Sequence, residues 1–228
     1  GTITANVDIN STTGHVTLVA SNSIALTDSA DVRTGGTGTI NLEATTGSIT
    51  QDDNSRLISA GGDIRLLANV NITLGGITTN VNASLTATTG SILDAGDLSG
   101  DEEVIASGLR LFAGTGIGGP TTHLETLITT LTARATSGGI YLTETDTLTI
   151  DDVAVTIEQV ASDATTATVN DLTQSDVITT AGDGDIVILT GASLTINDGT
   201  AATDDTGVQA HGAGNILLST TGTITANV

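Results

Sequence analysis

The sequence contains no lysine, no cysteine and no tryptophan among its 228 residues. Without cysteine the chain cannot form disulfides, thiolate metal sites or a cysteine nucleophile. Without lysine it lacks the lysine of a phosphate-binding loop, a Schiff-base amine and the lysine–asparagine crosslinks that staple some surface proteins. These absences exclude several large classes of enzyme chemistry, although they do not indicate the redox compartment.

Aromatic residues are nearly as scarce, because Phe112 and Tyr141 are the only two. Immunoglobulin-like sandwiches use tryptophan and tyrosine to fill a wide core, and sugar-binding clefts use them as stacking platforms. The single proline, Pro120, is typical of a chain in which most backbone N–H groups donate to a neighbouring strand. The composition therefore favours a thin core.

Basic residues are also few, since five arginines stand against 26 acidic residues and the formal net charge is −21. Such a charge argues against nucleic acid and anionic membranes as partners. No apolar run approaches the roughly 18–20 residues of a membrane span, and no signal peptide is recognisable. Because methionine is absent too, we expect the sequence to be an excerpt of a longer chain.

The chain repeats a short pattern in which apolar residues alternate and are followed by a turn and a further isoleucine. Its clearest copy covers residues 38–49, and a short strand ending in a glycine turn precedes most copies. The unit recurs at irregular intervals of roughly 20–30 residues. The first apolar residues of the copies are Val16, Ile40, Ile64, Ala83, Leu109, Leu131, Ile186 and Ile216. Each unit predicts three short strands, and no segment shows a convincing helical period.

Three strands of this length cannot bury their apolar face alone, whereas stacked units form one continuous core. We therefore predict an all-β fold over residues 1–228. The fold is a parallel β-solenoid, or β-helix, of about nine rungs with three short strands each and no caps. In such a coil the inward isoleucine, leucine and valine residues stack about 4.8 Å apart, so the core needs no aromatic side chains.

Residues 151–174 fit the pattern worst, because a strand-like start at Val153 is followed by a long stretch without a glycine turn. We interpret 151–174 as an enlarged loop on one rung. Residues 101–105 and 121–130 are smaller protrusions of the same kind. Such loops usually carry the specific contacts of a solenoid.

Residues 1–7 and 222–228 share the heptapeptide Gly-Thr-Ile-Thr-Ala-Asn-Val, an offset of 222 − 1 = 221 residues. Ile224 completes the copy that starts at Ile216, and Ile3 would complete a copy that starts before the chain. We therefore expect one period of about 221 residues in a tandem array, with identical repeats as end-to-end neighbours. Nine rungs would give an axial period of roughly 43 Å. The sequence leaves open whether such fibres also associate laterally.

Histidine and serine offer little support for catalysis. His15 falls in an outward column of the repeat, His211 falls in a turn column, and His123 lies in a protrusion without an assigned role. The repeat aligns His15 with Thr39, Asp63, Asp185 and Asn215. No Gly-x-Ser-x-Gly elbow is present, so a serine hydrolase is not expected.

Paired carboxylates are the stronger catalytic candidates, because β-helical polysaccharide hydrolases and lyases place such pairs on one face of the coil. The pairs are Asp52-Asp53, Asp151-Asp152 and Asp204-Asp205. Enzymes of this kind generally also need basic or aromatic residues to bind sugars, and both are scarce here. We therefore expect exposed turn carboxylates rather than an active site.

Acidic residues also follow the last strand of several units, namely Asp28, Asp52, Asp94, Glu144 and Asp198. Carboxylates stacked about 5 Å apart would repel each other by about 1 kcal/mol per pair even in water. A bound cation would relieve this repulsion, and calcium prefers carboxylate and carbonyl oxygens in loops. The candidate calcium ligands are Asp94, Asp97, Asp101, Asn197, Asp198, Asp204 and Asp205.

The repeated pattern Gly-x-Ile-x-Leu-x-Ala-x-Thr-Gly-x-Ile, clearest at 38–49 and 81–92, resembles the filamentous-haemagglutinin-like repeats of large bacterial exoproteins. The resemblance covers most of the chain. It implies a right-handed parallel β-helix, secretion to the cell surface, and a role as the shaft of an adhesin or extracellular fibre. It supplies no catalytic residues, and the amino-terminal secretion domain of that family has no counterpart here.

The expected function is therefore a structural repeat of a secreted or cell-surface fibrous protein or adhesin shaft, without enzymatic activity. The alternative is a carbohydrate-active β-helix that uses its paired carboxylates. A third hypothesis, an ice-binding solenoid, is suggested by the Thr-x-Thr pattern within 145–149 and would need flat threonine columns on successive rungs.

Overall fold

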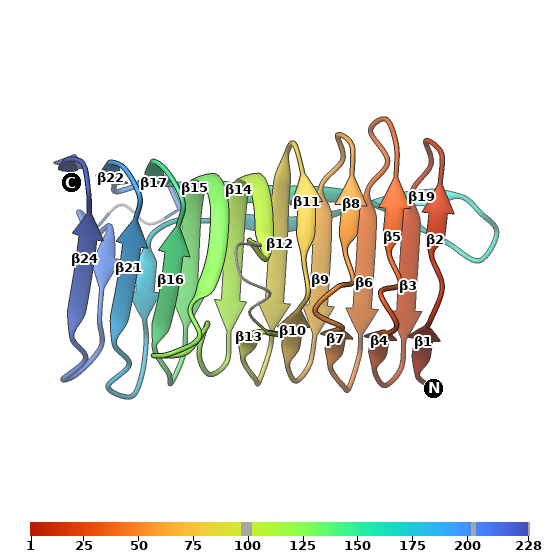
Figure 1. Cartoon of the computed structure of the whole chain (residues 1–228), viewed down its shortest axis with the longest axis horizontal. Coiled ribbons are helices and arrows are strands. Elements are labelled where there is room, and N and C mark those ends of the chain that lie inside the picture. The colour runs from red at the N-terminus through yellow and green to blue at the C-terminus, as the bar shows by residue number, and fades with distance from the viewer. Residues whose placement is uncertain (97–101, 202–203, 228) are drawn as a thin grey trace.

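The computed structural model describes residues 1–96, 102–201 and 204–227, and across these ranges it contains β-strands and no helix. Almost every strand pairs in parallel with a strand from the next repeat, and one antiparallel hairpin is the exception. Figure 1 shows the strands side by side along the long axis, with the termini at opposite ends. The chain is thus all-β, with mostly parallel strands in stacked sheets.

We call each successive set of strands a level, and the stacked sheets the first, second and third walls. The first four levels each place one strand in each wall, in chain order. These strands are β1 (Ile3–Ala5), β2 (Ile9–Ser11), β3 (Val16–Ala20), β4 (Ile24–Leu26), β5 (Val32–Thr34), β6 (Ile40–Ala44), β7 (Ile49–Gln51), β8 (Leu57–Ser59), β9 (Ile64–Ala68), β10 (Ile72–Leu74), β11 (Ile77–Thr79) and β12 (Asn82–Ala87).

In the middle levels two long strands run through the second and third walls without a break. The remaining strands are β13 (Ile92–Asp94), β14 (Val104–Ala113), β15 (Leu124–Ala135), β16 (Ile140–Glu144), β17 (Leu148–Ile150), β18 (Val153–Val160), β19 (Thr166–Gln174), β20 (Val177–Thr179), β21 (Ile186–Thr190), β22 (Leu194–Asn197), β23 (Val208–Gln209), β24 (Ile216–Thr220) and β25 (Ile224–Asn227). The long strands β14 and β15 lie in the fifth and sixth levels and mark where the cross-section changes. The seventh level contains β16, β17 and β20, the eighth β21, β22 and β23, and the ninth β24 and β25.

Nine isoleucines pair in one uninterrupted ladder from the first level to the last. The ladder consists of Ile3, Ile24, Ile49, Ile72, Ile92, Ile117, Ile140, Ile186 and Ile216. Its members from Ile24 to Ile186 are completely buried, because strand side chains alternate and these positions face inward. Each such side chain contributes about 1.5–3 kcal/mol by leaving water.

A second inward ladder runs along the third wall through the same nine levels. Its members are Val16, Ile40, Ile64, Ala83, Leu109, Leu131, Ile150, Ile196 and Ala226. Every member is a small or branched aliphatic residue, so these ladders pack without aromatic rings. This agrees with the thin core that the composition favours.

The five-residue strands change wall along the chain. They lie in the third wall as β3, β6 and β9, but in the later levels they continue the first wall as β16, β21 and β24. Ile186 and Ile216 therefore stack in the ladder of Ile3, which corrects their alignment with Ile40. Ile224 instead pairs with Leu194, so the identical heptapeptides occupy different walls. Alternation sets which residues face inward but cannot say which wall a strand joins.

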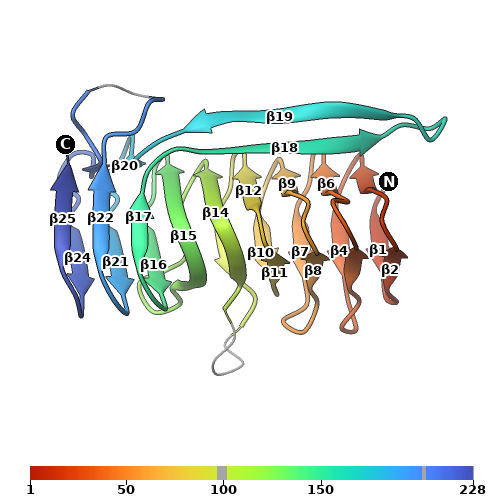
Figure 2. The ribbon, with the colours of Figure 1, turned by 90° about the horizontal axis from the view of Figure 1, so that it is seen from above.

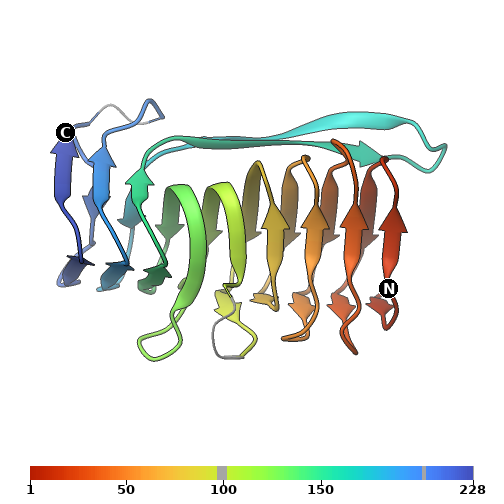
Figure 3. The same cartoon turned by 45° about the horizontal axis from the view of Figure 1, so that its top comes forward.

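Residues 151–174, expected as an enlarged loop, form an antiparallel hairpin of β18 and β19. Val153, Val155 and Ile157 alternate along β18 and are buried against the walls. The turn closes at Ala164, whose φ is 64°, while the Asp163 carboxylate accepts the Thr165 N–H at 3.1 Å. The hairpin runs along the long axis and covers one side of the stack (Figures 2 and 3).

Polar side chains from successive levels hold the outer edge of β18. Thr39 Oγ1 accepts the Glu158 N–H at 3.0 Å and donates to the Glu158 carbonyl at 3.3 Å. Asp63 Oδ2 accepts the Thr156 N–H at 2.8 Å. Side chains thus supply hydrogen bonds that a neighbouring strand would otherwise provide, and the edge of the hairpin is satisfied.

Candidate cation site

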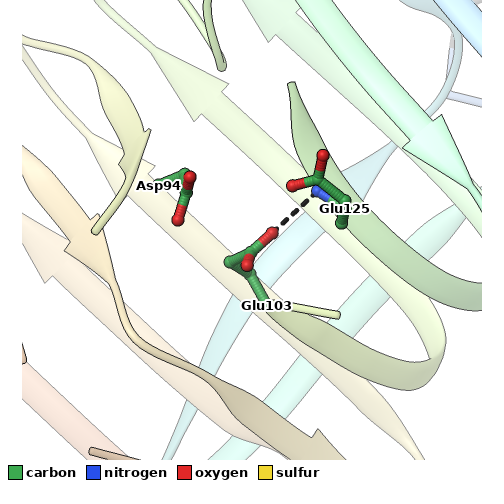
Figure 4. Close-up of side chains that lie close together, drawn as sticks. All are labelled: Asp94, Glu103 and Glu125. Atoms are coloured by element: carbon green, nitrogen blue, oxygen red, sulfur yellow. Dashed lines mark hydrogen bonds between the residues drawn. The ribbon is translucent and has the colours of Figure 1, made fainter. Parts of the chain in front are cut away.

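Three carboxylates gather at the fifth and sixth levels, where the cross-section changes. Asp94 ends β13, Glu103 precedes β14, and Glu125 lies in β15, and one oxygen from each lies within 4.8 Å of the others (Figure 4). The inward Ile92 fixes the position of Asp94 two residues later. The pairing of Val104 with Thr126 brings the two glutamates onto adjacent strands.

Backbone hydrogen bonds lock the two glutamates together. The Glu125 N–H donates to Glu103 Oε2 at 2.8 Å, and the Glu103 N–H donates to the Glu125 carbonyl at 3.0 Å. Glu103 is only 4% exposed, and this burial raises the pKa of its carboxyl to about 9, with the charges of Asp94 and Glu125 adding to the effect. The cluster therefore holds a proton at neutral pH, which a divalent cation could replace.

A fourth acidic side chain, Glu144, lies in the interior one level further on. It occupies the column of the second wall in which Val104 pairs with Thr126 and Thr126 pairs with Glu144. Thr126 Oγ1 donates to its carboxylate at 2.6 Å, and the Ile128 N–H donates at 3.1 Å. Burial raises the pKa of Glu144 to about 7, although these hydrogen bonds favour the charged form.

Only one of the candidate ligands from the sequence belongs to this cluster. Asp94 is a member, whereas Asp97 and Asp101 lie outside the described residues. Glu125 was missed as a ligand, because only the strand register brings it beside residues that precede it by more than 20 positions. Within the described residues, no other set of three acidic or histidine side chains converges this closely.

The second set of candidate ligands ties a loop together. Asn197 donates from Nδ2 to Asp151 Oδ2 at 2.7 Å, which connects β22 to the base of the hairpin. Asp198 and Asp204 both accept the Thr206 N–H, at 3.2 and 3.1 Å. Asp205 adopts a left-handed backbone with a φ of 58°. These contacts account for the acidic residues of this loop as turn-forming groups.

The expected acidic edge is only partly continuous. Asp28 and Asp52 follow strands of the first wall, whereas Asp94 is the last residue of β13 and pairs with Leu74. Asp198 follows β22, which pairs with β17 and lies on a different wall. The reason is the change of wall by the five-residue strands, so the proposed row of stacked carboxylates does not extend to Asp198.

The remaining catalytic candidates make structural contacts. His15 Nδ1 accepts the Thr39 N–H at 3.1 Å, and His123 Nδ1 lies 3.0 Å from Thr143 Oγ1. His211 Nδ1 donates to the Gly182 carbonyl at 2.7 Å. The column of His15 includes Thr39 and Asp63 as expected. Asp185 and Asn215 precede Ile186 and Ile216 on the first wall, so their assignment to that column was wrong.

One carboxylate pair serves as an anchor for the neighbouring loop. Both oxygens of Asp152 accept the Thr200 N–H, at 2.9 and 3.0 Å, and the Thr200 hydroxyl donates to the same carboxylate. Asp151 accepts the amide of Asn197 and the N–H of Asp152, the latter at 2.7 Å. The two carboxylates thus join the hairpin base to the level above.

The described residues include no helix with the length and hydrophobicity of a membrane-spanning segment. Comparison of the chain with protein-family models, with curated proteins and with solved structures finds no match to any of them.

Proposed function

We propose that the chain is a right-handed parallel β-solenoid that serves as a structural repeat in the shaft of a secreted or cell-surface filament or adhesin. One observation carries this proposal. The isoleucine ladder passes through every level, from Ile3 to Ile216, so each level is held by the same inward contacts as its neighbours. A fold of this kind resists bending and extends by stacking.

The extracellular location rests on the repeat pattern. The segments 38–49 and 81–92 resemble the filamentous-haemagglutinin-like repeats of bacterial exoproteins, which are surface shafts. The net charge of −21 is compatible with a solvated outer surface. Dense backbone pairing between levels would protect such a shaft from proteases, because cleavage requires local unfolding.

The proposed role is not enzymatic. Asp151 and Asp152, the best-placed carboxylate pair, are engaged by Asn197 and Thr200 in holding a loop. A hydrolase or lyase would instead need one carboxyl free to donate a proton and another free to act on water or on the sugar. This engagement favours the structural role over the carbohydrate-active alternative.

Calcium is the cation that we propose for the cluster of Asp94, Glu103 and Glu125. Calcium takes six to eight oxygen ligands and tolerates irregular geometry. The three carboxylates supply hard oxygen donors from three neighbouring strand segments, so a bound ion would join the fifth level to the sixth.

Immunoelectron microscopy would test the surface-shaft proposal. Antibodies against the folded chain should label intact source cells along extracellular filaments, and protease treatment of intact cells should remove the label. Permeabilised cells serve as the matched control for internal antigen. Label that appears only after permeabilisation would contradict the proposed location and with it the shaft function.

A further inference from the structure

The two ends of the stack match each other after a shift of one wall. At the carboxyl-terminal end, chain order gives a five-residue strand, β24, then the four-residue β25. The level beneath ends in the two-residue β23. At the amino-terminal end the order is β1 and β2, with three residues each, then the five-residue β3. The five-residue strands β3 and β24 therefore align only if one end is turned by one wall relative to the other.

The repeated heptapeptide indicates the same shift. Residues 1–7 and 222–228 are identical, yet Ile3 pairs with Ile24 on the first wall whereas Ile224 pairs with Leu194 on the next strand of the level. The strands of the two heptapeptides, β1 and β25, thus occupy positions that differ by one wall. Strand lengths and sequence identity are independent observations, and they agree.

We propose that a second copy of this chain stacks on the carboxyl-terminal end turned by one wall, with its residues 1–7 in the place of residues 222–228. This inference rests on the proposed shaft function and specifies how its repeats join. The second copy's β1 then pairs with β22, its β2 with β23, and its β3 with β24. No level is left empty and no turn lies over a strand.

The inward side chains at this joint are complementary. Val16 of the second copy lies over Ile216, its Leu18 over Leu218, and its Ile9 over Val208. The receiving end is apolar and open: Ile216 is 47% exposed, and a groove there is lined by Ile196, Val208, Leu218 and Ala226, among others. This arrangement continues the apolar ladders of the stack into the second copy.

An unturned joint fits worse in one column and in strand length. It would place Ile9 of the second copy over Thr220, and its five-residue β3 would begin over Ala226 of β25 and continue over the two-residue β23. The turn at residues 6–8 of the second copy would lie across β24. Such a joint leaves strand N–H and carbonyl groups without partners, which is costly in the interior.

The turned joint has a consequence for the surface of the shaft. Each chain carries one hairpin, β18–β19, on one side (Figure 2). Because every copy is turned by one wall relative to the copy below it, the hairpins would appear on three successive sides. The pattern repeats after three copies, so the shaft displays hairpins all around.

Disulfide trapping distinguishes the two joints. Because the chain has no native cysteine, only the introduced cysteines can form a crosslink. Ser219 is exposed, and the turned joint places Val19 of the second copy beside it on an adjacent strand, whereas the unturned joint places Asn6 there. Chains carrying Ser219→Cys are mixed with chains carrying Val19→Cys or, as the matched control, Asn6→Cys. Since strand neighbours lie within disulfide range, we expect at least about tenfold more crosslink with Val19→Cys.

In a mixture of separate chains, residues 222–228 of one copy compete with residues 1–7 of the next copy for the same place beside β22. A covalent fusion that omits residues 222–228 of the first copy removes this competition. Residues 1–221 are joined directly to a second copy of residues 1–228, with Ser219→Cys in the first copy and Val19→Cys in the second. The fusion should form the disulfide under mild oxidation, with circular dichroism as the check that both copies fold. A folded fusion that stays reduced would overturn the turned joint.

The outcomes separate the inference from the function on which it rests. A crosslink to Val19→Cys supports the turned joint. A crosslink to Asn6→Cys overturns it while leaving end-to-end stacking intact. If the folded chains give neither crosslink and scattering shows no end-to-end association, the shaft function is itself contradicted.

Discussion

Buried polar residues lie in the second wall where the cross-section changes, and their positions follow from the register. The second wall carries Val104 in the column that continues through Thr126 to Glu144. Glu144 is 1% exposed and receives hydrogen bonds from Thr126 and Ile128, so the interior tolerates it. Glu103 lies one residue before Val104 and is buried among other carboxylates. These side chains make stability depend on protons.

Replacing Glu103 with glutamine should stabilise the protein at alkaline pH. The pKa of Glu103 is raised to about 9 from 4.5, so the folded state binds more protons than the unfolded state between these values. Stability therefore falls as the pH rises through this window. Because the glutamine side chain would stay neutral and keep an oxygen for the Glu125 N–H, Glu103→Gln should stabilise the protein by roughly 4 kcal/mol more at pH 8.5 than at pH 5.

Urea unfolding of both proteins across this pH range measures the effect. Glu102→Gln is the control, because it removes the same charge from the neighbouring, half-buried position. A pH dependence that is unchanged by Glu103→Gln would show that this carboxyl does not carry the buried proton.

Among the elements, the hairpin ties distant levels together directly. The Val160 N–H donates to Thr17 Oγ1 at 2.9 Å, so the hairpin reaches from the seventh level back to the first. Arg65 Nε donates to Asp171 Oδ1 at 2.9 Å, and both side chains are largely buried. Removal of either partner would leave a buried charge, which is costly.

The substitution Ile157→Ala should loosen the hairpin without unfolding the walls. The Ile157 side chain is completely buried between β18 and the walls. Truncation of such a side chain typically costs about 2–3 kcal/mol of folding free energy. Because the walls pair independently of the hairpin, the cost should appear as local opening, and hydrogen exchange of the Glu158 and Val160 amides should accelerate roughly 30–100-fold. Leu172→Ala is the control, since Leu172 is 81% exposed. Equal acceleration in the control would contradict this docking.

Alternation in the sequence predicted most of the short strands and their inward residues, but residues 121–130, expected as a protrusion, lie largely in β15. Ile49 and Leu42 are buried as expected, because a period of two leaves one face for the core. The sequence could not predict which wall a strand joins, since Ile186 follows the same local pattern as Ile40. It also missed the hairpin, whose turn uses Asp163 and Ala164 instead of glycine. Long-range pairing decides both features.

The candidate cation site also contains one ligand that local sequence predicts and one that depends on long-range pairing. Asp94 could be named from its place after an inward isoleucine, because that relation is local. Glu125 could not, because its approach to Glu103 depends on pairing between β14 and β15. A register can be inferred from sequence only when loop lengths between levels are regular, and this region contains the most irregular loops.

At the scale of the whole molecule, the dominant quantity is the net charge of −21. Such an excess repels itself in the compact state and is spread along a narrow stack, where few basic groups offset it. Salt screens this repulsion over a Debye length of about 10 Å at 0.1 M. We therefore expect every salt to stabilise the fold by screening, whereas a bound cation should add a separate and saturable contribution.

Calcium should raise the melting temperature more than sodium at equal ionic strength. Screening depends on ionic strength alone, but binding to the folded state adds about 2.7 kcal/mol when the ion is at 100 times its dissociation constant. Thermal unfolding in NaCl and in CaCl₂ of matched ionic strength, each with and without chelator, measures the difference. Asp94→Asn should remove the calcium-specific part and keep the screening part, because Asp94 belongs to the carboxylate cluster. Asp163→Asn, in the exposed hairpin turn, is the control that should retain both parts. Identical curves in the two salts would contradict calcium binding while leaving the effect of the net charge in place.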